Sequence, residues 1–246
     1  MSLQLIFGIH AVKEAIEAGT EISKVIVQRE LASQALHEIE SNCRRRHIPV
    51  QRVPREKFNT YKSKNHQGVI AFVSPVLYQS LEQLVPTLFE EAKVPLLLML
   101  DRITDVRNLG AIARSAYAAG VHAIIVPLTE SAPINEDAIK TSAGALMHIP
   151  VCREAHFKTT LEFLHQSGIK SVACTEKART NIDAIDFTEP VVVIMGSEEK
   201  GISSELLRRC TEMAKIPMEF GVQSLNVSVA AEIILYESTR QRFPRK

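Results

Sequence analysis

From residue 95 to its end, the chain alternates short apolar runs with stretches of helical periodicity. Strands that alternate with helices build parallel sheets with helices packed on both faces. The apolar runs expected to be strands are 95–100, 123–126, 149–152, 171–174, 190–195 and 213–216. The helical patterns are 109–119, 136–143, 159–165 and about 227–242. The sequence therefore predicts an α/β fold with a parallel sheet over residues 95–246.

The first 75 residues repeat this alternation on a smaller scale. The helical patterns are 10–18 and 31–46, and the apolar runs are 24–28, 50–53 and 68–73. We expect residues 1–75 to form a small α/β domain of their own. Three prolines punctuate the segment that follows, so residues 76–94 are expected to be a linker that contains one helix.

Length and composition exclude several classes of protein. The chain has 246 residues, of which 46% are hydrophobic and 23% are charged, as in an ordinary globular protein. Its longest apolar run, 94–100, is far shorter than the ~20 residues of a membrane-spanning helix, and its start carries no secretory signal. The four cysteines lie far apart without a C-x-x-C pair, which disfavours zinc sites and disulfides. We therefore expect a cytoplasmic protein with no membrane segment and no metal.

Charge is distributed unevenly along the chain. Residues 1–75 hold 11 Lys and Arg against 7 Asp and Glu, whereas residues 76–246 hold 18 against 21. A basic N-terminal part favours a polyanionic partner bound by that part of the chain. A chance distribution of a few charges explains the difference equally well at this point.

The loop after the strand at 95–100 is the first place to look for a ligand, because ligands of open α/β sheets bind at the carboxyl ends of strands. The loop lacks the G-x-G-x-x-G pattern of dinucleotide-binding folds. Asn108 is either the N-cap of the next helix or a site residue. Arg114 lies among small residues of that helix, with Gly110 leaving space beside it, and is either a surface charge or a functional group.

Two later loops carry glycine and polar side chains. The first follows the strand at 190–195 and runs from Gly196 to Gly201, where glycines let the backbone approach a ligand closely. Its two adjacent glutamates suit a ribose hydroxyl or a cationic ligand better than a phosphate. The second loop holds Ser224, Asn226 and Ser228, which is more than one helix cap requires. A tight turn and ordinary capping are the alternatives.

Three segments together resemble the signature motifs of the SpoU (TrmH-type) RNA 2′-O-ribose methyltransferases, in the family's order and spacing. They are DRITDVRNLGAIARSAYAAGVHAIIVP, VVVIMGSEEKGIS and IPMEFGVQSLNVSVAAEIILYE. Near the start, FGIHAVKEAIEAG and NHQGVIAFVSP resemble the substrate-binding domain of the same family. The resemblance implies a SPOUT catalytic domain with a deep trefoil knot, an L30e-like N-terminal domain, S-adenosylmethionine as cofactor and a homodimer.

The resemblance also implies roles for individual residues. The catalytic set would be Asn108, Arg114, Glu198 and Asn226. The cofactor would be held around Gly196, Gly201, Ile216, Ser224 and Leu225. Candidates for RNA phosphate contacts are Arg44, Arg45, Arg46, Lys62, Lys64 and His66. The chain departs from the family pattern at Glu199-Lys200, which lacks a second glycine, and at Glu219-Phe220, which is bulkier than usual.

The expected reaction is transfer of a methyl group from S-adenosylmethionine to a ribose 2′-hydroxyl of RNA, most closely resembling the family members that act on a guanosine of 23S rRNA. Arg114 is expected to stabilise developing negative charge, since arginine is a poor base. The alternatives are a tRNA ribose methyltransferase and an RNA-binding ribosome assembly factor that has lost catalysis. Binding of S-adenosylmethionine separates the last alternative from the other two.

Overall fold

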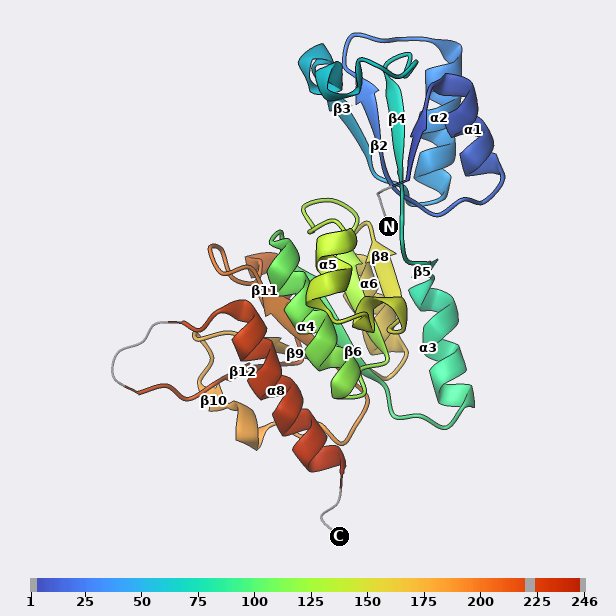
Figure 1. Cartoon of the computed structure of the whole chain (residues 1–246). Coiled ribbons are helices and arrows are strands. Elements are labelled where there is room, and N and C mark those ends of the chain that lie inside the picture. The colour runs from blue at the N-terminus through green and yellow to red at the C-terminus, as the bar shows by residue number, and fades with distance from the viewer. Residues whose placement is uncertain (1–3, 220–223, 244–246) are drawn as a thin grey trace. The chain divides into compact units, whose positions relative to one another are not determined.

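The computed structural model describes residues 4–219 and 224–243, and the chain divides into two compact units (Figure 1). The first unit comprises Met1–Leu77 and Ile134–Glu136, and the second comprises Tyr78–Pro133 and Asp137–Lys246. Each unit has its own sheet and its own buried core.

The first unit is built on a four-stranded mixed sheet in the order β1-β4-β2-β3. The strands are β1 (Leu5–Phe7), β2 (Ile22–Gln28), β3 (Val50–Val53) and β4 (Val69–Val73). β2 runs parallel to β3 and antiparallel to β4. Helices α1 (Ile9–Glu17) and α2 (Gln34–Arg45) bury Val12, Ile16 and Ile39 against one face, and η1 (Arg55–Tyr61) packs Phe58 on the other.

The second unit is built on an eight-stranded sheet in the order β10-β12-β9-β11-β6-β7-β8-β5, in which every neighbouring pair is parallel. The strands are β5 (Tyr78–Gln79), β6 (Leu96–Asp101), β7 (Ala123–Pro127), β8 (Val151–Glu154), β9 (Lys170–Cys174), β10 (Thr180–Asn181), β11 (Val191–Gly196) and β12 (Glu212–Lys215). The α/β fold with a parallel sheet is therefore confirmed. The trefoil knot stays a prediction.

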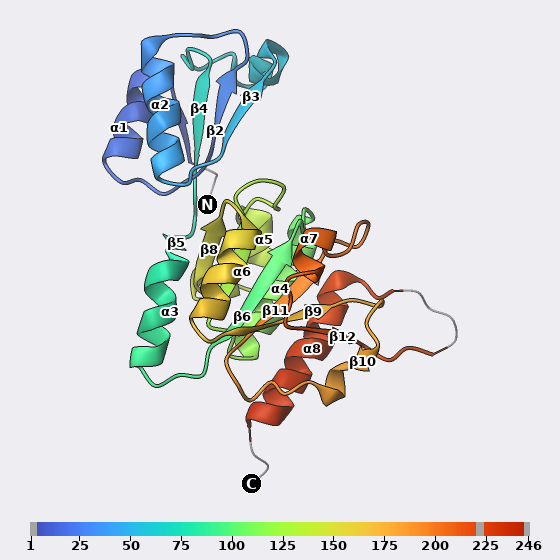
Figure 2. The same cartoon turned by 180° about the vertical axis from the view of Figure 1, so that it is seen from behind.

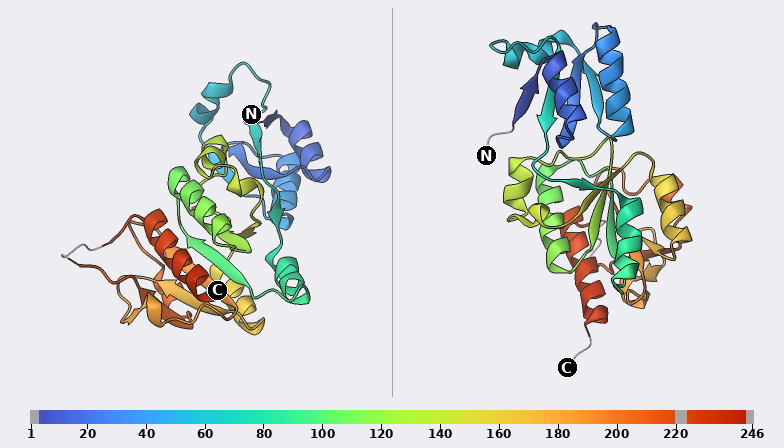
Figure 3. Two further views of the ribbon diagram at one scale, coloured as in Figure 1. Left: turned by 60° about the horizontal axis from the view of Figure 1, so that its bottom comes forward. Right: turned by 90° about the vertical axis from the view of Figure 1, so that its right-hand side faces the viewer.

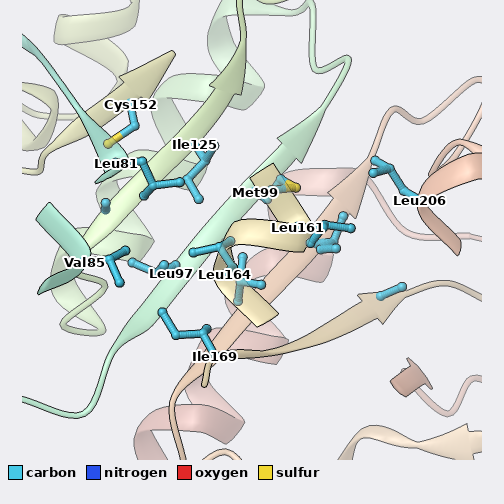
Figure 4. Packing of buried hydrophobic residues seen from close by; sticks show 14 of the residues in the cluster. Leu81, Val85, Leu97, Met99, Ile125, Cys152, Leu161, Leu164, Ile169 and Leu206 are labelled. Atoms are coloured by element: carbon cyan, nitrogen blue, oxygen red, sulfur yellow. The ribbon is translucent and has the colours of Figure 1, made fainter. Parts of the chain in front are cut away.

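Helices cover both faces of this sheet. Figure 1 shows α4 (Val106–Ala118), α5 (Glu136–Thr141) and α8 (Val227–Arg242) on one face, and Figure 2 shows α3 (Leu81–Glu90), α6 (Phe157–Gln166) and α7 (Ser204–Leu207) on the other. Short η2 (Ala145–Met147) and η3 (Ile182–Ala184) complete the connections. On the second face, Leu81, Leu161 and Leu206 pack with the strand residues Leu97 and Met99 (Figure 4). Central strands buried on both faces explain the continuous apolar runs in the sequence.

The segment expected to be a linker belongs to the second unit. β5 pairs with β8 at one edge of the sheet, and α3 buries Leu81, Val85 and Leu88 in the core. These three leucine and valine positions lie on one helical face, so burying them requires the helix to pack on the sheet. The one helix expected within residues 76–94 is α3, and the division between the two units falls between Leu77 and Tyr78.

The strand order sets where a ligand can bind. On one side of β6 the sheet continues with β7 and then β8, and on the other side of β6 it continues with β11 and then β9. Asp101 at the end of β6 is in register with Gly196 at the end of β11. In open α/β sheets the crevice at such a switch in strand order is the usual ligand site.

Candidate active site

The loop after β6 places Asn108 inside a helix rather than at its cap. The side chain of Asp105 accepts a hydrogen bond of 2.8 Å from the backbone N–H of Asn108, so Asp105 is the N-cap of α4. The helix therefore begins three residues earlier than the sequence pattern indicated, and the capping interpretation of Asn108 is wrong. An N-cap side chain ordinarily accepts the N–H of the residue two or three positions later. Asp105 in the sequence therefore indicates a helix that begins at Val106.

Asn108, Glu198 and Asn226 form one hydrogen-bonded cluster, although they come from three distant segments. Asn108 Nδ2 donates to Glu198 Oε1 at 3.2 Å, and Asn226 Nδ2 donates to Asn108 Oδ1 at 3.1 Å. Asn226 Nδ2 also donates to Glu198 Oε1, which in addition accepts the backbone N–H of Val227 at 3.2 Å. The structure thus brings together three of the four predicted catalytic residues around one carboxylate oxygen.

Asn226 is also the N-cap of α8, so the capping interpretation is confirmed, and its functional role stays a prediction. Its Oδ1 accepts the backbone N–H of Ser228 at 2.9 Å and the Ser228 hydroxyl at 2.6 Å. The cap fixes the orientation of the amide, which leaves Nδ2 directed at Glu198 and Asn108. Ser228 therefore supports the orientation of Asn226.

The loop that carries Glu198 is closed on itself. A Cβ atom on Gly196 would lie 2.1 Å from the carbonyl carbon of Gly201 and 2.2 Å from the nitrogen of Ile202, so only glycine fits there. The N–H of Gly201 donates to Ser197 O at 2.8 Å, and Gly201 itself has φ +62°, a conformation that suits glycine. Gly196 is therefore required by close packing of the loop, and Gly201 is favoured by its backbone conformation.

Two residues that the sequence analysis did not single out anchor this loop to β6. Buried Asp101 accepts the N–H of Ser203 at 2.7 Å and pairs with Arg102, whose Nε lies 3.0 Å away. Arg102 Nη2 also donates to Gly201 O at 3.2 Å. The hydrogen bond to Asp101 raises the pKa of Arg102, so the guanidinium stays charged. The sequence indicates this role only through an acidic residue at the end of an apolar strand, because a carboxylate buried there needs a hydrogen-bond or ion-pair partner.

A cleft of about 880 Å³ opens at the carboxyl ends of β9, β11 and β12. All five predicted cofactor-binding residues line it: Gly196, Gly201, Ile216, Ser224 and Leu225. Its walls combine apolar side chains, such as Ile182, Ile202 and Ile234, with the charged loop 197–200. Apolar walls with a few polar groups, and loops in which backbone comes close enough to bond a ligand, suit an adenosine joined to a charged amino-acid tail.

A second cleft of about 290 Å³ lies on the other side of the Glu198 loop. It is lined by Arg102, Asp105, Asn108 and Glu130, and it shares Ser197–Lys200 and Val227 with the larger cleft. The cluster of Asn108, Glu198 and Asn226 therefore stands where the two clefts meet. A donor in one cleft and an acceptor in the other would react at this wall.

Arg114 is not part of the cluster. It is exposed on α4, lines neither cleft, and makes no hydrogen bond or ion pair within the described residues. The expected free space beside Gly110 is filled, because a Cβ there would lie 2.6 Å from the Cβ of Thr141 and 2.9 Å from the carbonyl oxygen of Ala138. Gly110 therefore serves the close packing of α4 on α5.

Large apolar side chains are exposed on α4, on α8 and on η2. α4 and α8 lie side by side (Figure 1, Figure 3), joined by a hydrogen bond of 3.1 Å from Ser115 Oγ to Glu232. The large apolar side chains exposed on these helices and on η2 are Tyr117, Met147, Val229, Ile233 and Tyr236. Tyr236 is 69% exposed, which is unusual for an aromatic side chain unless another surface covers it.

The predicted RNA-contacting residues fall into two separate groups within the first unit. Arg44, Arg45 and Arg46 lie where α2 ends and the chain turns into β3, whereas Lys62 and Lys64 follow the end of β3 and η1. The two groups therefore lie toward opposite ends of the small sheet. His66 is half-buried: its Nδ1 accepts the N–H of Gly68 at 2.9 Å, and its ring stacks on Phe58. His66 thus holds the loop, while the other five side chains are exposed.

The four cysteines and His122 are not assigned to the site. All four cysteines are free, and burial raises the pKa of Cys174, at the edge of the larger cleft, to about 12. His122 Nδ1 accepts the N–H of Leu96 at 3.0 Å. Within the described ranges, no group of His, Cys, Asp and Glu is placed to hold a metal ion, and no helix is long and apolar enough to cross a membrane. Phe220, one of the departures in the third motif, lies outside the described residues.

Comparison with known proteins finds relatives over nearly the whole chain. Residues 95–236 match the SpoU rRNA Methylase family, and residues 5–79 match the RNA 2′-O ribose methyltransferase substrate binding family. A Staphylococcus saprophyticus protein assigned to the TrmH family of tRNA/rRNA methyltransferases is 35% identical over 238 residues, which cover 97% of this chain and 96% of the relative.

Two solved structures add the fold and the cofactor. The AdoMet-bound rRNA methyltransferase from Sinorhizobium meliloti has a TM-score of 0.63, is 26% identical and covers 98% of this chain and 88% of its own. The TrmH/SpoU tRNA modifying enzyme from A. aeolicus has a TM-score of 0.56, is 30% identical and covers 65% of this chain and 83% of its own. The resemblance drawn from the three motifs is confirmed by these matches.

Proposed function

Because the chain belongs to the SpoU (TrmH-type) family of RNA 2′-O-ribose methyltransferases, with S-adenosylmethionine as cofactor, we propose that it methylates the ribose of a guanosine in 23S rRNA. The observation that carries the proposal is the cluster of Asn108, Glu198 and Asn226 at the wall between the two clefts. It places oriented polar groups where a donor and an acceptor would meet.

The larger cleft is the proposed cofactor site. Gly196 lets the backbone of Gly201 and Ile202 pack against it, and Gly201 has open space beside it. Ile216, Ser224 and Leu225 also line the cleft. When bound there, S-adenosylmethionine supplies an electrophilic methyl group on a positively charged sulfur. Glu198 lines this cleft, and its negative charge favours a cation beside it.

The cluster acts by positioning. A ribose 2′-hydroxyl is a weak nucleophile, so its alignment with the methyl carbon contributes much of the rate. Oε1 of Glu198 is filled by donors from Asn108, Asn226 and Val227, whereas its other oxygen makes no hydrogen bond within the described chain. We propose that this oxygen accepts a hydrogen bond from the ribose 2′-hydroxyl. Asn108 is assigned to orient the nucleotide.

Arg114 has a different role in this proposal. A guanidinium remains protonated at neutral pH and so stabilises negative charge rather than taking a proton. Arg114 lies six residues beyond Asn108, which is about 9 Å along the helix. We therefore assign it to the phosphate and the developing charge of the nucleotide, from the exposed face of α4.

We place a homodimer interface on the apolar face of α4 and α8. Tyr117, Ile233 and Tyr236 are exposed there, and no element of the described chain covers them. Burying such a face against its symmetric copy is the usual solution for soluble oligomers. Arg114 lies on the same face, so pairing would bring each Arg114 next to the second copy.

Ribosomal RNA is favoured over tRNA by the extent of the matches. The Sinorhizobium rRNA methyltransferase covers both units of this chain, whereas the tRNA modifying enzyme of A. aeolicus covers 65% of it. The additional unit is the substrate-binding match at residues 5–79, and it carries the excess of positive charge. Exposed Arg44, Arg45, Arg46, Lys62 and Lys64 are the proposed phosphate contacts.

The test is incubation of the purified protein with methyl-labelled S-adenosylmethionine and either unmodified 23S rRNA or unmodified bulk tRNA. We expect label in 23S rRNA at one guanosine whose 3′ linkage then resists alkali, and no label with Asn226→Ala. Label in tRNA alone would move the substrate to tRNA. Absence of label with no cofactor binding would favour the non-catalytic assembly factor and contradict the proposal.

A further inference from the structure

The second cleft is formed by three loops that each follow one of three neighbouring strands. They are 102–105 after β6, 128–132 after β7 and 197–200 after β11. The cleft shares the 197–200 wall with the larger cleft, so a nucleotide whose ribose meets the cofactor at Glu198 would extend its base into it. None of the assigned catalytic roles explains the charged residues that line the rest of this space.

Glu130 is one of these residues, and its loop is held at both ends. The N–H of Leu128 donates to Glu154 O at 2.9 Å, and the N–H of Ala132 donates to Ile103 O at 2.8 Å. Between them, Glu130 adopts φ +57°, a conformation that a side-chain-bearing residue keeps only when its surroundings impose it. Glu130 thus lines the second cleft from a defined backbone position.

Arg102 supplies donors in the same cleft. Its Nε and Nη2 atoms are tied to Asp101 and Gly201, which fixes the plane of the guanidinium. Nη1 makes no hydrogen bond within the described chain. The cleft therefore offers one immobilised donor group from Arg102 and one carboxylate acceptor from Glu130.

This pair of groups discriminates among the four bases. Guanine presents two adjacent donors, N1–H and the 2-amino group, which match the two oxygens of a carboxylate, and beside them the O6 acceptor, which matches an arginine donor. Uracil has a single ring N–H, and adenine and cytosine place an acceptor ring nitrogen beside their amino group, where a carboxylate is repelled. A carboxylate or guanidinium that loses water to the bound base and is left unpaired by the wrong one would weaken the binding of that base.

We propose that the second cleft holds the target base and that Glu130, with Nη1 of Arg102, selects guanine. This inference rests on the proposed ribose methylation and adds the residues that choose the base. It does not assign Glu130 a part in the methyl transfer itself.

The experiment uses a 23S rRNA fragment that contains the mapped target nucleotide, synthesised with guanosine, inosine or adenosine at that position. kcat/KM is measured for the wild type, for Glu130→Gln and for the control Glu90→Gln, which removes an equal charge from exposed α3. The wild type and the control should prefer guanosine over inosine by about tenfold or more, because inosine lacks the 2-amino donor to a charged acceptor. Glu130→Gln should reduce this preference to about threefold or less.

Two readouts separate the failure of this inference from failure of the proposed function. Unchanged affinity of Glu130→Gln for S-adenosylmethionine shows that the site is folded. An undiminished guanosine preference in Glu130→Gln, or a wild type that treats the three nucleotides alike, overturns the base assignment while leaving ribose methylation intact. A wild type that methylates none of the fragments, and no guanosine in intact 23S rRNA, overturns the proposed function instead.

Discussion

At the scale of single residues, the site depends on side chains with two tasks each. Asn226 caps α8 through Oδ1 and bonds Glu198 and Asn108 through Nδ2. Gly196 ends a strand and leaves room for the backbone of Gly201 and Ile202. Because each task uses a different atom or a different contact, substitutions can remove one task and keep the other.

Asn226→Asp should separate the cap from the cluster. Aspartate is as good an N-cap as asparagine, so the melting temperature should change little. The new carboxylate would face Glu198 without a donor, and the methylation rate should fall by at least ~10²-fold, as when one oriented donor is lost. Thermal unfolding and single-turnover methylation measure the two effects. A variant that is equally active would show that the cluster does not contribute to catalysis.

Gly196→Ala should weaken cofactor binding, because the added methyl group displaces the backbone of the loop. The added Cβ would lie 2.1 Å from Gly201, so the loop must move as a whole. We expect the Kd for S-adenosylmethionine, measured by calorimetry, to rise about tenfold or more, since a displacement of this kind costs more than ~1.4 kcal/mol. Gly120→Ala is the matched control, because that glycine has φ +75° but open space around it. It should lose about 1 kcal/mol of stability and keep cofactor affinity.

At the scale of elements, helix ends and strand ends define the architecture of the second unit. The last turn of α8 is tied to the amino-terminal edge of the sheet by Arg242, which donates to the carbonyls of Val94, Pro95, Phe187 and Glu189. The first turn of the same helix holds Asn226 at the site. Stability at one end of α8 is therefore linked to geometry at the other.

Arg242→Met should lower the free energy of unfolding by about 2 kcal/mol, because it leaves half-buried carbonyls without a charged donor. Urea denaturation measures the change. Arg240→Met is the comparison, since Arg240 is exposed and, among the described residues, pairs with Glu237 on its own helix. It should leave the free energy of unfolding nearly unchanged, as is usual for an exposed ion pair. Equal losses in the two variants would contradict the role given to Arg242.

His122, which precedes β7 and is hydrogen-bonded to Leu96 at the start of β6, should make the free energy of unfolding depend on pH. Burial, and then the nearby charges of Arg242 and Lys93, lower the pKa of His122 from 6.5 in the folded state. Between that lowered value and 6.5 the unfolded chain binds more protons, so stability is fully present above pH 6.5 and falls as the pH drops below it. His122→Gln should flatten this part of the profile in urea denaturation from pH 7.5 to 5. Parallel profiles for the two proteins would refute it.

Local signals predicted most elements, and non-local contacts account for what was missed. The helix at 227–242 was found with both ends as predicted, because a capping Asn226 precedes a long helical pattern. β5 has two residues and exists only through its pairing with β8, so no periodicity reveals it. Asp101 and Arg102 anchor a loop about a hundred positions away, which no local pattern shows. The motifs, not the periodicity, indicated Glu198 and Asn226 as members of one site.

At the scale of the whole molecule, the proposed homodimer brings a second copy of the chain to the site. Tyr117, Ile233 and Tyr236 are exposed on α4 and α8, and Tyr117 lies three positions beyond Arg114 on α4. Neither their exposure nor the position of Arg114 outside the cluster is explained by the single chain. A dimer through this face would explain both.

Ile233→Asp should convert a dimer into a monomer, because it places a charge in the middle of this face. Light scattering after size exclusion at micromolar concentration measures the mass. Methylation should fall together with dimerisation. Phe89→Asp is the control, since Phe89 is similarly exposed but lies on α3. A wild type that stays monomeric would contradict this interface, whatever its activity.

The most direct test of the site is a crystal structure of the protein with S-adenosylmethionine. The account predicts the cofactor in the larger cleft, against Gly196, Ile216 and Leu225, with its methyl group directed at the wall where Glu198 meets the second cleft. A cofactor bound elsewhere, or with its methyl group turned away from Asn108, Glu198 and Asn226, would contradict the assignment of these residues to the reaction.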